Sequence, residues 1–359
     1  MQTIKAAVCH APKTPLVIED IQLSPPGPDQ VEVTLEAVAI CHSDISFIDG
    51  AWSCPFPAVF GHEAVGHITA TGPGARASLG ARVIVTLLHS CGTCQCCATG
   101  APAHCETSID RMAGQVRTMS GDPIHYGINC AAFAEKVVVH QSQIASVPAS
   151  IPAASASLLA CGVVTGIGAA VNTAKVRPGE TVVVIGAGGV GLNAIQGARI
   201  AGASRIIAVD MLEEKLTVAR EFGATDGILA STPEPWNEAL KIAPRGADVV
   251  LVTVGAVTAY ESALGYLGQK GRMYMVGMTH SGQSARYEPV NVCAAGQRME
   301  GSLMGDTVLS RDIPWMIDMY SQGRLKLDEL VSATWRLDQI NEAIASTKSG
   351  AARRNVIVF

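Results

Sequence analysis

The stretch TVVVIGAGGVGLNAIQGARIAGASRIIAVDM, residues 181–211, decides the fold. Its β-branched run at 181–185 predicts a buried strand, the residues that follow predict an amphipathic helix, and SRIIAVD predicts a second strand that ends at Asp210. Between the first strand and the helix, Gly186, Gly188 and Gly191 give the pattern G-x-G-x-x-G. These glycines allow a tight turn in which the backbone can approach a pyrophosphate at the helix N-terminus. The arrangement predicts a dinucleotide-binding α/β domain.

The acid at the end of the second predicted strand bears on the choice of dinucleotide. The carboxylate of Asp210 can accept hydrogen bonds from the adenosine ribose hydroxyls, and its charge would repel the 2′-phosphate of NADP. The next residues, MLEE, contain no arginine that would bind this phosphate. The sequence therefore favours NAD over NADP.

The composition is typical of an α/β enzyme. Of the 359 residues, 48% are hydrophobic, 16% are charged and 36 are glycine, and the length suffices for about two domains. A net charge of −5 predicts no nucleic-acid or anionic-membrane partner. The start MQTIKAAVCHAPK has no apolar run typical of a signal peptide, and Ser, Thr and Gly interrupt the apolar run at 154–171. We therefore expect a cytoplasmic protein in which that run is buried core.

Five of the 11 cysteines lie within residues 90–105, SCGTCQCCATGAPAHC. A disulfide framework is not expected in a long chain in a reducing compartment. The C-x2-C-x2-C-x7-C spacing of Cys91, Cys94, Cys97 and Cys105 instead fits four thiolates around one zinc ion. Such a set leaves no open position, so we expect a structural site, with free thiols as the alternative. Cys96 is the spare cysteine and is expected to point away.

A second group of potential ligands is scattered along the chain. CHSD at 41–44, GHEAVGH at 61–67 and ACGVVTG around Cys161 contribute cysteine and histidine side chains. Each alone is weak, because a cysteine in an apolar run is usually inert core and a single histidine usually has a structural partner. Together, two cysteines and one histidine match the three-ligand set of a catalytic zinc, whose fourth position is left for water or substrate.

These motifs occur in a defined order: CHSD, GHEAVG, the four-cysteine stretch, CGVVTG, GAGGVG, VD followed by Lys215, and RRNVIVF. In order and spacing the chain resembles a zinc-dependent alcohol dehydrogenase of the medium-chain dehydrogenase/reductase superfamily over essentially its whole length. The resemblance implies an α/β fold with a GroES-like β-barrel catalytic domain at 1–161, which carries the cysteine lobe at 90–106. It further implies a Rossmann domain with a doubly wound parallel sheet at 162–302 and a return to the catalytic domain at 303–359.

The resemblance also implies roles around the catalytic zinc. Cys41, His62 and Cys161 would bind the ion, and Glu63 would lie behind it as an outer or transient ligand. Asp44 would hold the ligand histidine in one tautomer.

Proton transfer would involve Ser43, which corresponds to the hydroxyl residue that contacts the substrate oxygen. The chain departs from many members of the family at Ser46, where they carry a histidine. Proton release to solvent would then need Ser46 with a water molecule, or His42.

The cofactor contacts implied by the resemblance involve the pyrophosphate, the ribose and the nicotinamide. They are His42, Thr165, Gly186, Gly188, Gly189, Val190, Gly191, Asp210, Lys215, Val254, Val276, Met278 and Arg354. Among them, Arg354 is assigned to the pyrophosphate, and a solvated terminal charge is the alternative.

The resemblance places five apolar side chains around the substrate. They are Trp52, Leu87, Ile128, Met278 and Leu303. Leu87 and Gly127 stand at positions where many relatives carry an aromatic residue, so we expect an enlarged pocket for aromatic, allylic or medium-chain primary alcohols.

The expected activity is zinc-dependent oxidation of primary alcohols to aldehydes with NAD, and the reverse, by a homodimer or homotetramer with two zinc ions per chain. One alternative is a glutathione-dependent formaldehyde dehydrogenase, although the loop DGAWSCPFP offers only Asp49 as an acid for the glutathione conjugate. Another is a non-catalytic binding or regulatory member of the superfamily, although such a protein would not need an open zinc site.

Overall fold

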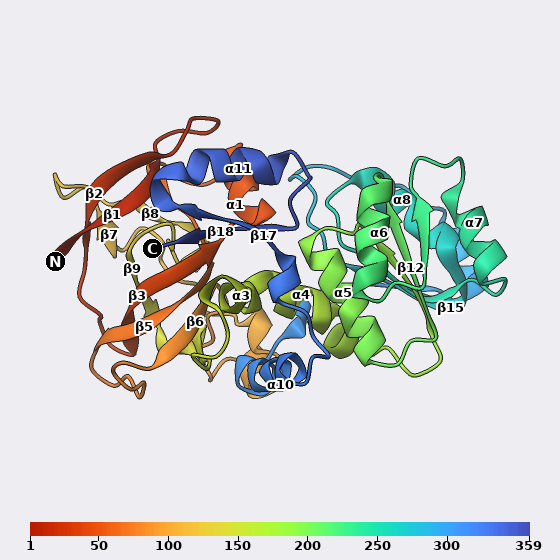
Figure 1. The fold of residues 1–359 in the computed structure, drawn as a ribbon, viewed down its shortest axis with the longest axis horizontal. Helices are drawn as coiled ribbons and strands as arrows, with labels where there is room; N and C mark the ends of the chain where they lie inside the picture. The colour runs from red at the N-terminus through yellow and green to blue at the C-terminus, as the bar shows by residue number, and fades with distance from the viewer. The chain divides into compact units, whose positions relative to one another are not determined.

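The computed structural model describes residues 1–359, and the chain divides into two compact units (Figure 1). The first unit comprises Met1–Cys161 and Val308–Phe359, and the second comprises Gly162–Thr307. The return to the first unit was expected at 303. Residues 303–307 stay with the second unit because Gly305 packs against helical backbone there: a Cβ added to it would lie 2.4 Å from the carbonyl oxygen of Val164.

The first unit is built on two sheets. The smaller has the order β7-β2-β1-β4-β8, with the bounds β7 Val116–Arg117, β2 Val17–Leu23, β1 Gln2–Cys9, β4 Ala58–Val59 and β8 His125–Tyr126. The larger has the order β10-β6-β5-β3-β18-β17, and β9 also pairs with β3. Its strands are β10 Ile144–Ser146, β6 Arg82–Thr86, β5 Glu63–Thr71, β3 Gln30–Ala39, β18 Arg354–Val358, β17 Val331–Arg336 and β9 Lys136–His140.

Alternation along the strands gives these sheets a common core. In β3, the buried Val33 and Leu35 alternate with the half-buried Thr34 and Glu36, as expected of a strand with one face on the core. Buried side chains of both sheets belong to one cluster, and Phe60 and Phe133 are among its fully buried members. The helices of this unit are α1 His42–Ile48, α2 Gln95–Ala98, α3 Ala153–Leu158, α10 Leu309–Ser321 and α11 Ile340–Lys348.

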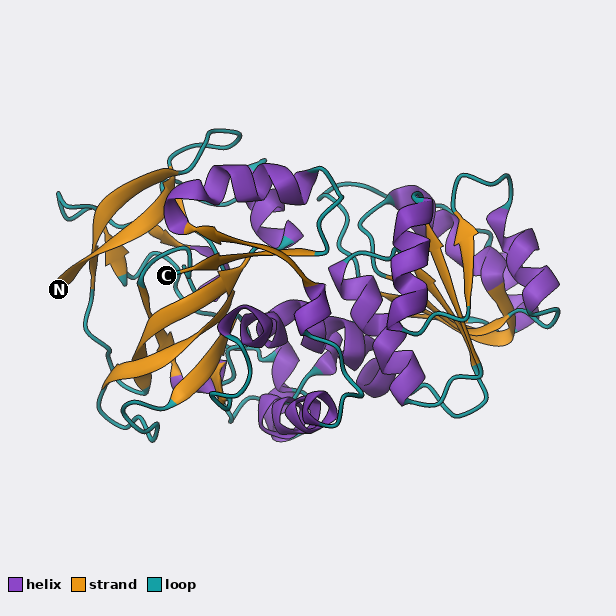
Figure 2. Ribbon diagram, in the orientation of Figure 1, coloured by secondary structure: helices purple, strands orange, loops and turns teal.

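The second unit is a parallel sheet with helices beside both of its faces (Figure 2). Its order is β13-β12-β11-β14-β15-β16, with the bounds β13 Asp226–Leu229, β12 Arg205–Asp210, β11 Thr181–Ile185, β14 Ala247–Val252, β15 Leu267–Met275 and β16 Arg298–Gly301. The helices are α4 Val164–Gly168, α5 Gly189–Ile200, α6 Glu213–Phe222, α7 Pro235–Ile242, α8 Val257–Ala263 and α9 Pro289–Ala295. The predicted strand at 181–185 and the predicted strand that ends at Asp210 are therefore confirmed as β11 and β12.

The apolar run near the middle of the chain is helical from Ala153 to Thr173. It is the one helix long and apolar enough to cross a membrane, with a mean hydropathy of 1.8, and 89% of its apolar window is buried inside the structure. That burial agrees with the expected core segment. Two of its turns are π-helical, Leu159–Val163 and Ala169–Thr173, and such turns often occur at functional sites.

Candidate functional site

Four potential metal ligands come together inside the first unit. Each of Cys41, His62, Glu63 and Cys161 offers one ligand atom, and these atoms all lie within 4.8 Å of one another. Cys41 caps the N-terminus of α1, His62 directly precedes β5, Glu63 is its first residue, and Cys161 lies in the first π-helical turn. Both His62 and Glu63 are fully buried.

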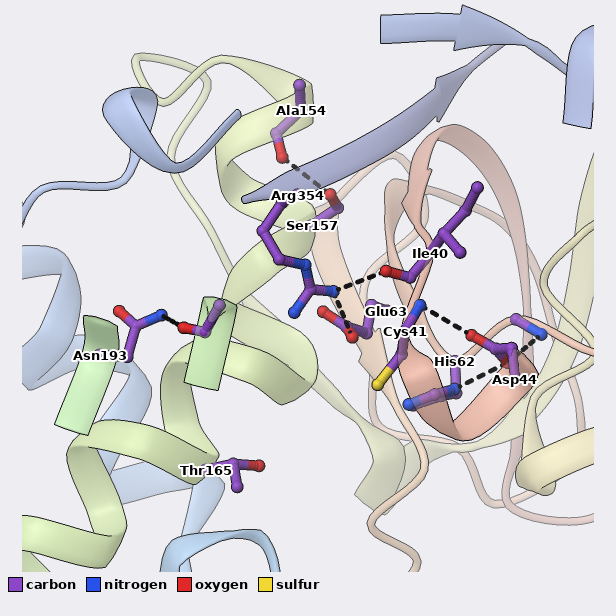
Figure 3. Close-up of polar contacts among 12 residues, drawn as sticks. Ile40, Cys41, Asp44, His62, Glu63, Ala154, Ser157, Thr165, Asn193 and Arg354 are labelled. Carbon is purple, nitrogen blue, oxygen red and sulfur yellow. Dashed lines mark hydrogen bonds and ion pairs between the residues drawn. The ribbon is translucent and has the colours of Figure 1, made fainter. Parts of the chain in front are cut away.

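Asp44 fixes two of these residues from its position in the first turn of α1. Its Oδ1 accepts hydrogen bonds from Nδ1 of His62 at 3.1 Å and from the backbone N–H of Gly61 at 2.9 Å. Its Oδ2 accepts one from the backbone N–H of Cys41 at 3.1 Å. Figure 3 shows Asp44 in contact with both His62 and Cys41. A carboxylate on Nδ1 selects the tautomer whose lone pair is on Nε2.

The other ring nitrogen of His62, Nε2, indicates that the site binds a ligand from outside the protein. Nε2 is buried and has no hydrogen-bond partner, although buried polar atoms are nearly always satisfied. Burial lowers the pKa of His62, but Asp44 and Cys41 outweigh burial and raise that pKa well above its usual range. The same neighbours would stabilise a cation at this position, and a zinc ion that replaces the Nε2 proton would bind that nitrogen beside two cysteine sulfurs.

Glu63 is paired with Arg354, the first residue of β18. The two side chains form an ion pair at 2.5 Å, and Arg354 also donates to the carbonyl oxygen of Ile40 at 3.3 Å (Figure 3). Burial raises the pKa of Glu63 to about 7, although the nearby guanidinium opposes the shift. Arg354 is only 6% exposed, so its alternative interpretation as a solvated terminal charge is wrong.

The cysteine lobe forms a second group. The ligand atoms of Cys91, Cys94, Cys97 and Cys105 also lie within 4.8 Å of one another. Backbone N–H groups donate to these sulfurs. The N–H of Cys94 donates to Sγ of Cys91 at 3.3 Å, that of Cys97 to Sγ of Cys94 at 3.4 Å, and that of Cys91 to Sγ of Cys105 at 3.3 Å. Such donors stabilise the thiolate form that binds metal. Cys96 is outside this group and contacts Glu106 at 3.6 Å.

The glycine-rich turn lies between β11 and α5. Gly186 has a φ of +99°, and a Cβ on Gly191 would lie 1.8 Å from the carbonyl oxygen of Gly186. These two positions therefore require glycine. Asp210 ends the neighbouring strand β12, and its carboxylate accepts hydrogen bonds from the backbone N–H of Ala187 at 2.8 Å and of Leu212 at 3.2 Å.

The remaining residues assigned to the cofactor are distributed over both units. Thr165 lies in α4 with its hydroxyl 3.5 Å from the sulfur of Met304, and Lys215 lies in α6. His42 and Arg354 belong to the first unit, whereas Gly188, Gly189, Val190, Val254, Val276 and Met278 belong to the second. Their contacts with a cofactor stay predictions.

The residues expected around the substrate are also distributed over both units. Trp52, Leu87 and Ile128 belong to the first unit, whereas Met278 and Leu303 belong to the second and are 62% and 42% exposed. Their joint pocket therefore stays a prediction.

The expectation that Gly127 enlarges this pocket is wrong. A Cβ at position 127 would lie 2.4 Å from the carbonyl oxygen of Val59 and 2.6 Å from the ring of Phe60. The space that a side chain at position 127 would need is filled by the core. Asn129 and Gln143 anchor the segment after Gly127 and were not predicted, because a single amide in a loop carries no recognisable pattern.

Comparison with known proteins connects this geometry to a family. Residues 27–149 match the model of the alcohol dehydrogenase GroES-like domain, and residues 189–322 match that of the zinc-binding dehydrogenases. An alcohol dehydrogenase zinc-binding domain protein from Burkholderia ambifaria is similar, with a TM-score of 0.95 and 32% identity, over 100% of this chain and 99% of that chain.

Two further solved structures extend the comparison. Benzyl alcohol dehydrogenase from Acinetobacter calcoaceticus has a TM-score of 0.94 and 30% identity, with 100% of both chains covered. An NAD-dependent alcohol dehydrogenase has a TM-score of 0.82 and 25% identity, with 99% of both chains covered. The chain therefore belongs to the zinc-dependent alcohol dehydrogenases of the medium-chain dehydrogenase/reductase superfamily, which are oxidoreductases with a GroES-like domain and a Rossmann domain.

Proposed function

We propose that the chain oxidises primary alcohols to aldehydes with NAD as hydride acceptor, and catalyses the reverse reaction. The observation that carries the proposal is the buried, unpartnered Nε2 of His62 beside Cys41 and Cys161. These three residues would hold a catalytic zinc ion, and Cys91, Cys94, Cys97 and Cys105 would hold a second, structural ion. A bound zinc ion would supply Lewis-acid polarisation of the alcohol oxygen, and the nicotinamide would accept the hydride.

Other residues of the chain would orient the zinc ligands and transfer the proton. Asp44 orients the imidazole of His62 and holds the backbone of Cys41, which keeps both ligands in place before any ion binds. Ser43 would relay the proton of the substrate hydroxyl: its Oγ would accept that proton and release its own towards the nicotinamide ribose. Ser46 with a water molecule, or His42, would then pass this proton to solvent.

The preference for NAD rests on Asp210. Its position at the end of β12, next to the glycine-rich turn, is the position from which a carboxylate reads the ribose hydroxyls. The Nε donor of Arg354 has no partner within the protein, which supports its assignment to the cofactor pyrophosphate. The similarity to an NAD-dependent alcohol dehydrogenase supports the same choice.

For the substrate we propose aromatic, allylic or medium-chain primary alcohols. Trp52, Leu87 and Ile128 are apolar and would leave any additional hydroxyl or carboxylate of a substrate unpaired. The similarity over the full length to a benzyl alcohol dehydrogenase supports an aromatic substrate.

We further propose a cytoplasmic homodimer or homotetramer. All the cysteines of the chain are free, which suits a reducing compartment. Strand β16 lies at an edge of the six-stranded sheet, and Arg298, Glu300 and Gly301 in it are exposed. A second copy that pairs with this edge would protect its backbone groups.

Steady-state kinetics tests the proposed activity. The purified protein is assayed with a panel of alcohols and aldehydes, with NAD and with NADP, and with and without glutathione. We expect NAD-linked turnover of benzyl alcohol that does not require glutathione. Turnover of formaldehyde that depends on glutathione, or no turnover of any alcohol by protein that contains zinc, would contradict the proposal.

A further inference from the structure

The segment after β8 has a strained backbone. Ile128, Asn129 and Ala131 have φ values of 48°, 59° and 52°. A β-branched residue is disfavoured in this left-handed region because its Cβ approaches the following carbonyl oxygen. Ile128 is also only 7% exposed. Strain of this kind persists only where surrounding contacts fix the conformation, and it is common at ligand-binding sites.

The side chain of Asn129 supplies two of the fixing contacts. Its Oδ1 accepts a hydrogen bond from Nε of Arg111 at 2.8 Å, and its Nδ2 donates to the carbonyl oxygen of Leu87 at 3.2 Å. Asparagine is also among the non-glycine residues that best tolerate the left-handed region. The Asn129 residue therefore tolerates the left-handed backbone, and its side chain joins this segment to Leu87.

The amide of Gln143 fixes the same segment from a second direction. Its Nε2 donates to the carbonyl oxygens of Asn129 at 2.9 Å and Thr86 at 3.0 Å, and its Oε1 accepts from the backbone N–H of His140 at 3.2 Å. Gln143 is only 1% exposed. Thr86 is the last residue of β6 and His140 is the last residue of β9, so these contacts attach the segment to both strands.

We propose that Asn129, held by Arg111, is a positioning residue for substrate specificity. It keeps the backbone of Ile128 left-handed and holds Leu87 beside it, and so sets the shape of the pocket wall that these two side chains form. The inference rests on the proposed function, because it requires Ile128 to line the substrate pocket. Without the two side-chain hydrogen bonds of Asn129, Ile128 relaxes towards a negative φ and its side chain leaves the pocket wall.

The test begins with Asn129→Gly. Glycine still permits the left-handed backbone but removes both side-chain hydrogen bonds. The readout is the ratio of kcat/KM for benzyl alcohol to kcat/KM for ethanol, with zinc content and Tm measured in parallel. We expect the ratio to change about tenfold, the size of a substrate discrimination set by one apolar contact. The change should appear in KM for benzyl alcohol, while kcat for ethanol is retained.

Two variants separate a positioning role from general loss of stability. Asn341→Ala removes a similar pair of hydrogen bonds elsewhere in the first unit, between Asn341 and the backbone of Leu16, both at 2.9 Å. It should lower Tm and leave the ratio unchanged. Asn129→Asp keeps an acceptor for Arg111 but replaces the donor to Leu87 with an oxygen, so it should recover only part of the wild-type ratio. A ratio that changes equally in Asn341→Ala would overturn the proposal.

A double-mutant cycle then tests whether Asn129 acts through Ile128. In an Ile128→Ala background, Asn129→Gly should change the ratio much less, because one of the two side chains that Asn129 positions is absent. An equal effect in both backgrounds overturns the positioning role while the pocket assignment stands. If Ile128→Ala alone leaves the ratio unchanged, the pocket assignment itself is wrong. A crystal structure of Asn129→Gly should show Ile128 outside the left-handed region, and an unchanged φ would also overturn the inference.

Discussion

The guanidinium of Arg354 and the carboxylate of Glu63 form an ion pair at 2.5 Å, and neither residue is more than 6% exposed. The pair links the first residue of β18 to the first residue of β5, beside the proposed zinc ligands. Loss of one partner from a buried pair leaves an uncompensated charge, whereas loss of both partners does not.

Arg354→Met should therefore lower the free energy of unfolding by about 3–5 kcal/mol. The double variant Glu63→Gln/Arg354→Met should lose clearly less, because no buried charge remains unpaired. Chemical denaturation of metal-free protein at neutral pH measures both values. Equal losses in the single and double variants would show that packing of the arginine, and not its charge, stabilises the site.

Metal analysis should find about two zinc ions per chain, because the structure contains two separate groups of potential ligands. Cys94→Ser should lose one ion and mainly stability. Cys161→Ser should abolish turnover in a protein that still binds NAD and keeps the other ion. A single zinc ion in fully active protein would contradict the two-site assignment.

Asp44→Asn should weaken zinc retention by about 10–100-fold, the effect typical of residues that orient a metal ligand. An asparagine can still accept from His62 and Gly61 through Oδ1, but its NH2 group then faces the backbone N–H of Cys41. Competition with a chelator measures the affinity, and NAD binding by the same variant is the control. Unchanged zinc retention would mean that Asp44 only caps α1.

Substitutions of Asp210 should separate its charge from its structural contacts. Asp210→Asn removes the charge that repels the 2′-phosphate and keeps one acceptor oxygen, so the preference for NAD over NADP should fall, and the loss of stability should be smaller than in Asp210→Ala because only one backbone N–H loses its acceptor. Asp210→Ala also leaves the N–H groups of Ala187 and Leu212 without their acceptor, at a cost of about 1–3 kcal/mol for each donor that stays buried. Kinetics with both cofactors and thermal unfolding measure the two effects. Equal use of NADP by the wild type would contradict the assignment.

A series of alcohols from ethanol to octanol, with benzyl alcohol, tests the apolar pocket. The value of kcat/KM should rise along the series, because each buried methylene contributes about 0.8 kcal/mol. Leu87→Phe should reduce the rise by narrowing the pocket. A flat or falling series would refute the assignment of Trp52, Leu87 and Ile128 to the substrate.

The sequence predicted those features whose determinants are local in the chain. The strand at 181–185, the glycine-rich turn and the four-cysteine lobe each depend on residues within a short stretch, and the structure forms each of them as expected. The partner of Arg354 was not predicted, because its pairing with Glu63 depends on strand β18 joining β3 in the completed fold. The tight packing at Gly127 and the left-handed backbone of Ile128 were missed for the same reason, since both are imposed by Phe60, Asn129 and other tertiary neighbours.

The position of β18 between β3 and β17 has a consequence for synthesis on the ribosome. The second unit is continuous in sequence and can fold as soon as its residues have emerged. The first unit begins earlier but lacks an interior strand until Arg354–Val358 have been translated. During that interval Ala37–Ala39 of β3 lack their partner strand, although β9 can already pair with Gln30–Thr34, and this end of β3 is open to association with other nascent chains. The first unit would therefore be completed after the second although its chain emerges first, and chaperone protection should be needed mainly for the part translated first.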